Sequence, residues 1–153
     1  MSSYPFAVFF ANPTTMYVTD EGTGNATDAA SNAGLQKWVL GSDGTWHLQY
    51  VLTKGLIGVV DVNVTGSDGP WPAITTIGLR NLTGRINRNG TVTLWATTST
   101  KSASGDNGAD PNKVVEITDQ IAATQLSQVA NESFITDAGP VYGTVFRGVG
   151  FVE

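Results

Sequence analysis

The chain has 153 residues, enough for one domain with a hydrophobic core, and 41% of them are apolar, which excludes a disordered polar chain. Its formal net charge of −5 and its eight scattered lysine and arginine residues argue against nucleic-acid binding, which needs clusters of positive side chains. The absence of cysteine excludes disulfides and thiolate metal sites, the single histidine excludes multi-histidine zinc sites, and no apolar run is long enough for a membrane span.

Four strands are predicted in the first third of the chain. Apolar or β-forming stretches end at turn signals such as Asn-Pro and Asp-Gly, and in the last stretch Trp46, Leu48 and Tyr50 alternate as if on one face. The strands are expected at residues 5–11, 16–20, 35–40 and 45–52. Because the connections include tight turns, we expect neighbouring strands to be antiparallel.

A second set of strands follows a long connection over 53–78, which itself has room for a short strand within 56–64. The turn before residue 91 contains the favoured Asn-Gly pair, and residues 121–129 are expected to form a short helical turn or loop. The strands of this set are expected at residues 82–87, 91–97, 113–118, 132–136 and 141–152. No segment shows a convincing helical stripe.

Two segments of the chain share one pattern. Residues 14–22 and 91–99 each follow a short apolar strand and an asparagine-containing turn, and each precedes a long polar loop. A repeat of roughly 80 residues made of short strands predicts a radial or stacked β architecture.

The first of these segments continues into a recognisable motif. The stretch Tyr17-Val18-Thr19-Asp20, followed by Gly34-Leu35-Gln36-Lys37-Trp38, resembles a blade of the NHL- and SMP-30-like β-propellers. Residues 104–113 and 147–151 resemble parts of large secreted bacterial propeller proteins of unassigned function. The resemblance implies an all-β chain of propeller-type blades, each with four antiparallel strands: blade one at about 5–52, a connection over 53–78, blade two at about 79–137, and an extra innermost strand at 141–152.

Two blades do not close a propeller ring, which takes about four to eight. We therefore expect the ring to be completed either by self-association into a homo-oligomer or by further blades of a longer chain. Only 14% of the residues are charged, a composition common in secreted proteins, which suggests an extracellular or cell-envelope location.

The acidic loops are the first candidate site. In a propeller the loops that follow the second strand of each blade emerge on the same side, so Asp20 and Glu21 are expected to share a rim with Asp106, Asp110 and Asn112. The last three place side-chain oxygens within seven residues, and such hard ligands suit calcium. The alternative is a solvated loop in which these side chains stabilise their own turns.

Other residues carry open alternatives. Asp20 and Glu21 could contact a ligand or act as an acid and base, or Asp20 could hydrogen-bond the adjacent glycine-rich loop. Trp71, in the sequence Pro70-Trp71-Pro72, could stack on a carbohydrate or pack within its loop.

The arginines near the predicted innermost strands are a further candidate. Arg80, Arg85 and Arg147 could hold an anionic ligand, or they could pair with neighbouring carboxylates. His47, on a predicted outer strand, is expected to be a surface residue.

No catalytic residues are assigned. The chain has no Gly-X-Ser-X-Gly nucleophile elbow. The sequence favours a non-catalytic module that binds a ligand, a carbohydrate or small molecule, or a protein partner, and that self-assembles. The alternative, implied by the SMP-30-like resemblance, is a metal-dependent hydrolase or lactonase-like enzyme with a site on the loop face.

Overall fold

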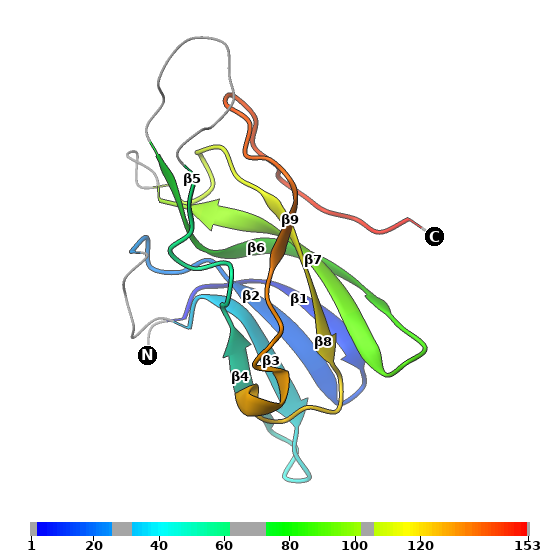
Figure 1. The fold of residues 1–153 in the computed structure, drawn as a ribbon. Coiled ribbons are helices and arrows are strands. Elements are labelled where there is room, and N and C mark those ends of the chain that lie inside the picture. The colour runs from blue at the N-terminus through cyan, green and yellow to red at the C-terminus, as the bar shows by residue number, and fades with distance from the viewer. Residues whose placement is uncertain (1–2, 26–31, 62–72, 102–105, 153) are drawn as a thin grey trace.

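The structure is a computed structural model that describes residues 3–25, 32–61, 73–101 and 106–152. These residues form two antiparallel β-sheets and one short 3-10 turn (Figure 1). The prediction of an all-β fold is confirmed. Across the same residues, no helix has the length and apolar character needed to traverse a membrane.

The first sheet is a four-stranded meander in which each strand pairs with the next along the chain. Its order is β1-β2-β3-β4, formed by β1 (Pro5–Asn12), β2 (Thr15–Asp20), β3 (Gly34–Leu40) and β4 (Trp46–Leu52). The turn between β1 and β2 is stabilised by Asn12, whose side-chain Oδ1 accepts the backbone N–H of Thr14 at 2.9 Å. The four predicted strands are therefore confirmed.

The second sheet is a curled five-stranded meander (Figure 1). Its strands are β5 (Val60–Asp61), β6 (Ile74–Ile86), β7 (Thr91–Thr100), β8 (Val114–Gln120) and β9 (Ile135–Ala138), with the 3-10 turn η1 (Leu126–Val129) between β8 and β9. The predicted second unit has four strands and starts at about residue 79, whereas the observed second sheet has five strands and starts at Val60. The reason is that β6 begins at Ile74, where Ile74 and Ile77 are buried, and its first two residues pair with β5.

The prediction of a strand over residues 141–152 is wrong. This segment has an isolated β-bridge at Val141 but no strand among its described residues. It is held instead by side chains: Asn112 exchanges hydrogen bonds with the backbone of Phe146, and the Phe151 ring stacks on Trp95. Gly143, Gly148 and Gly150 explain the difference, because glycine weakens strand formation.

A β-bulge decides which way β4 faces. Lys37 pairs with Tyr50 while the next residue, Trp38, pairs with Leu48, so Gln49 is the extra residue. Tyr50 and Leu48 consequently lie on opposite faces, and the prediction that Trp46, Leu48 and Tyr50 share a face is wrong. The bulge turns Tyr50 toward the second sheet.

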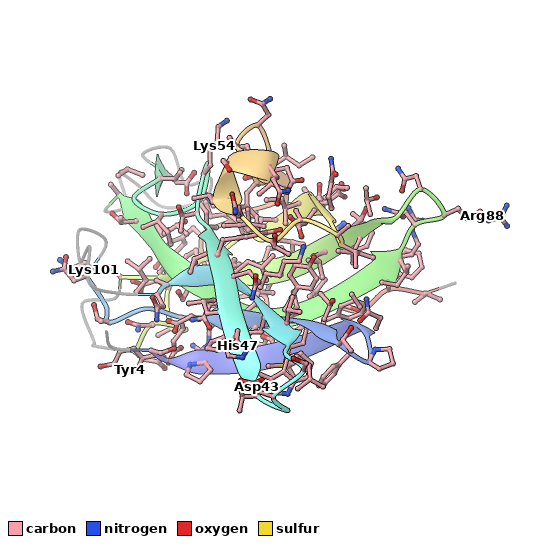
Figure 2. All side chains as sticks on the ribbon, turned by 90° about the horizontal axis from the view of Figure 1, so that it is seen from below. Tyr4, Asp43, His47, Lys54, Arg88 and Lys101 are labelled. Carbon is pink, nitrogen blue, oxygen red and sulfur yellow. The ribbon has the colours of Figure 1, made fainter. Side chains whose placement is uncertain are left out.

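The core lies between the two sheets, which form two layers (Figure 2). The first sheet contributes a register row across its four strands, Phe9, Tyr17, Lys37 and Tyr50. The second sheet contributes buried residues of β7 and β8, namely Val92, Leu94, Ala96, Val115 and Ile117. Gly84 on β6 makes room for this packing, because a Cβ there would lie 2.9 Å from Cζ of Phe9.

Candidate ligand-binding site

Arg80 is the centre of the candidate site. It lies on β6, and its guanidinium is stacked over the ring of Phe6 from β1, 4.4 Å from the ring centroid. Two carboxylates approach it, one from the loop after β2 and one from the loop after β7: Glu21 Oε2 lies 3.5 Å from Nε, and Asp106 Oδ1 lies 3.6 Å from Nη1. Both distances are longer than a strong charge-assisted hydrogen bond, so the guanidinium retains donor capacity for a further partner.

A glycine makes this position of Arg80 possible. A Cβ built on Gly108 would lie 1.5 Å from Nη1 of Arg80, so a larger residue at this position would displace the guanidinium. The N–H of Gly108 is in turn held by Asp106, whose Oδ1 accepts it at 2.8 Å. The loop after β7 thus packs the backbone of Gly108 closely against the guanidinium.

A pocket of about 150 Å³ opens beside this guanidinium. Its walls come from β1, from β6, from the loop before β8 and from the C-terminal segment, and they are formed by Phe6, Arg80, Asn81, Gly108, Asn112, Val145, Phe146 and Arg147. The lining residues therefore include two arginines, two asparagines and two phenylalanines. Such a mixture of apolar walls and a few convergent polar groups is typical of small-molecule sites.

The predicted calcium ligands are placed differently from one another. Asp106 contacts Arg80, whereas Asn112 is buried and uses its amide to bind the carbonyls of Thr98 and Phe146 and its Oδ1 to accept the N–H of Phe146. Asp110 is half-buried near the start of β8. Over the described residues, no group of three or more acidic or histidine side chains is arranged to hold a metal ion. Calcium binding stays a prediction.

The Asp20 side chain is used in hydrogen bonds within the fold. Its carboxylate is fully buried and accepts hydrogen bonds from the Ser3 hydroxyl, from the backbone N–H groups of Tyr4 and Gly22, and from the side-chain amide of Gln36. These bonds tie the start of β1 and the loop after β2 to β3. The alternative in which Asp20 stabilises the glycine-rich loop matches this arrangement.

Arg85 and His47 are not among the residues that line the pocket. The guanidinium of Arg85 lies 5.2 Å from the Phe151 ring centroid and 6.0 Å from that of Trp95, on the outer side of the second sheet. Trp71 lies outside the described residues. His47 is exposed and bonds Asp43 at the tip of the β3–β4 hairpin (Figure 2), where hydrogen bonds from Thr45 and then His47 hold the pKa of Asp43 at about 2.

Sequence reasoning missed a buried polar cluster between the sheets. Lys37 and Asp119 form an ion pair with an Nζ–Oδ2 distance of 3.0 Å, and both side chains are 0% exposed. The ammonium also donates to the Tyr50 hydroxyl at 2.9 Å and to the Gln120 carbonyl at 2.6 Å. Asp119 accepts further bonds from the hydroxyls of Tyr17 and Tyr50, so both charges of the Lys37–Asp119 pair are hydrogen-bonded.

The cluster shifts the protonation equilibria of its members. Burial, followed by the nearby Asp119 carboxylate, raises the pKa of both tyrosine hydroxyls, and burial lowers the pKa of Lys37 against the opposing effect of Asp119. One signal for the cluster was present in the sequence. Asp119 continues the inward alternation of Val115 and Ile117, and a carboxylate on an apolar face needs a buried partner.

Glu132, between η1 and β9, faces the same cluster and predicts a pH effect on stability. Burial and then Asp119 raise its pKa from 4.5 to about 8, while Lys37 opposes the shift and the two tyrosines remain neutral in this range. Between about pH 4.5 and 8 the folded chain therefore holds a proton that the unfolded chain has released, so this group's contribution to stability falls as pH rises. We expect Glu132→Gln to remove that decline, measured as the difference in unfolding free energy between the variant and the parent at pH 5 and pH 8. A difference that stays constant with pH would contradict the assignment.

Comparisons of the chain with family models, with curated proteins and with solved structures found no match. The fold and the site by themselves define the class: an all-β protein of two packed antiparallel sheets with an arginine-lined pocket at one end of their junction.

Proposed function

We propose that this chain is a non-catalytic, β-propeller-type binding module that holds a small organic carboxylate in the pocket between Arg80 and Arg147. The observation that carries the proposal is that two arginine residues, Arg80 and Arg147, line one small pocket. Guanidinium forks match the planar geometry of carboxylates and hold them through paired hydrogen bonds.

The size and charge of the pocket favour a carboxylate over a larger anion. A volume of about 150 Å³ has room for a group of a few heavy atoms. Glu21 and Asp106 flank Arg80, so the two arginines and two carboxylates together are formally neutral, which suits a monoanion better than a dianion. The phenylalanine rings offer apolar contact to the stem of such a ligand.

Two structural details support the propeller part of the proposal. Each sheet is built as a meander, and the first strand of one sheet, β1, lies against β6 of the other. The same unusual bond occurs in both: the hydroxyl of Thr19 accepts the N–H of Ala7 in the first sheet, and that of Thr97 accepts the N–H of Asn81 in the second. The two sheets therefore share a structural detail, as expected if they are repeated units of a stacked architecture.

The test is binding of sodium propionate, with the uncharged propionamide as the comparison. We expect propionate, and not propionamide, to shift the backbone amide resonances of Gly108 and of residues 145–147. Arg147→Met should weaken binding by about 10- to 100-fold, the range for a hydrogen bond between charged groups. Arg147 is exposed, so its replacement should leave the fold intact.

Arg88→Met is the matched control. Arg88 is an exposed arginine at the tip of the β6–β7 hairpin, far from Tyr4 (Figure 2), and it does not line the pocket. It should bind propionate as the parent chain does. Equal shifts with propionate and propionamide, or equal losses in the two arginine variants, would overturn the proposal.

A further inference from the structure

One face of the first sheet is apolar and uncovered. The apolar side chains that point away from the second sheet include Val8, Phe10, Met16, Val18, Trp38, Leu40, Trp46 and Leu48, which we call the open face. Phe10 is 54% exposed and Val8 50% exposed, and Phe10 packs edge-on against Trp46 with 6.0 Å between ring centroids. Contiguous apolar patches of this kind on soluble proteins mark interaction surfaces.

The second sheet contains the counterpart of this face. When β2 is superposed on β7 so that the matching hydrogen bonds of Thr19 and Thr97 coincide, Met16 is equivalent to Leu94. The strand registers then align Trp38 of β3 with Ile117 of β8. The open face of the first sheet is therefore equivalent to the Leu94 and Ile117 face of the second, which is buried.

What buries that face is the row Phe9, Tyr17, Lys37 and Tyr50 of the first sheet. The same alignment identifies the equivalent row on the second sheet, namely Thr83, Trp95, Glu116 and Ile135. This row lies on the outer side of the second sheet, where Ile135 is 58% exposed and the Phe151 ring is stacked on Trp95. We call it the outer row.

The molecule thus buries one interface between two sheet faces. It leaves the open face uncovered, and within the described residues its C-terminal segment contacts the outer row at Trp95. We propose that the open face is covered by the outer row of a second copy of this chain, so that copies associate head to tail. Each new contact repeats the stacking of the two sheets within one chain. This inference is independent of the carboxylate site.

A contact between two different surfaces of identical chains is heterologous and continues until a ring closes or a fibre grows. Each chain contributes two sheets, and rings of four to eight such units are those that propellers use. We therefore expect closed assemblies of about two to four copies.

Light scattering after size-exclusion chromatography measures the assembly. The parent chain should elute as a stable multiple of 16.1 kDa. Phe10→Asp, on the open face, and Ile135→Asp, on the outer row, should each give a monomer, with folding checked by circular dichroism. Leu126→Asp, an equally exposed apolar residue on η1, should leave the assembly unchanged.

Mixing the two monomeric variants separates head-to-tail contact from any symmetric contact. The outer row of the Phe10→Asp chain is intact, and so is the open face of the Ile135→Asp chain. The mixture should therefore form a dimer of one copy of each and stop there. A monomeric parent chain, or a mixture that stays monomeric, would overturn the inference. Propionate binding by the Phe10→Asp chain tests the pocket separately, so the two proposals fail independently.

Discussion

Replacing Lys37 by methionine should lower the free energy of unfolding by about 3–5 kcal/mol. Methionine fills a similar volume but leaves Asp119 buried without its ammonium partner, and an unpaired buried charge is strongly unfavourable. Because Asp119 lies on β8 and Lys37 on β3, the loss should loosen the junction of the two sheets. Chemical denaturation followed by tryptophan fluorescence measures the change.

The matched control is Lys101→Met, because Lys101 is an exposed lysine at the end of β7 (Figure 2) and should tolerate the same substitution with little effect. The double variant Lys37→Met/Asp119→Leu should be more stable than Lys37→Met alone, since it removes the stranded charge. It should not recover fully, because the hydroxyls of Tyr17 and Tyr50 lose their acceptor. A Lys37→Met chain as stable as the Lys101→Met chain would show that the ion pair does not hold the sheets together.

Replacing Asp20 by alanine should destabilise the fold by roughly 3 kcal/mol, because it strands several buried donors at once. Among them are the backbone N–H groups of Tyr4 and Gly22 and the amide of Gln36. Propionate binding by the folded fraction should persist, because Asp20 is not part of the pocket wall. Thermal unfolding and the same binding assay separate the two effects.

Asp137→Ala is the control for this substitution, since Asp137 is an exposed aspartate on β9. It should leave the unfolding temperature within the small range of ordinary surface changes. If Asp20→Ala were as stable as the control yet failed to bind ligand, Asp20 would belong to the site and not to the framework.

The strands and the tight turns were predictable because their causes are local. Alternation within 15–20 and 91–97, and the Asn-Gly and Asp-Gly turns, act between residues that are neighbours in the chain. The start of β6 at Ile74 was not predicted, because the segment becomes a strand by pairing with β5 and β7. The fate of residues 141–152 was also not predictable, since their β-forming residues are held by Asn112 and Trp95 in place of a neighbouring strand.

The candidate site was predictable only in part. The sequence indicated acidic loops and scattered arginines, but it did not indicate that Glu21 and Asp106 meet at Arg80 or that Arg147 shares the same pocket. It likewise left undecided whether Asp20 and Asn112 contact ligands, because the residue type alone does not tell whether a carboxylate or an amide is buried.

The sequence by itself determined the all-β class, the meander of the first four strands and the positions of the turns, because alternation and turn chemistry are set within a few residues. Only the tertiary structure decided which sheet faces meet and which stay open. One bulged residue, Gln49, turns Tyr50 inward, and Lys37 finds Asp119 across 82 positions of the chain. Such contacts depend on how two sheets stack, and stacking is decided by burial and charge pairing over the whole fold.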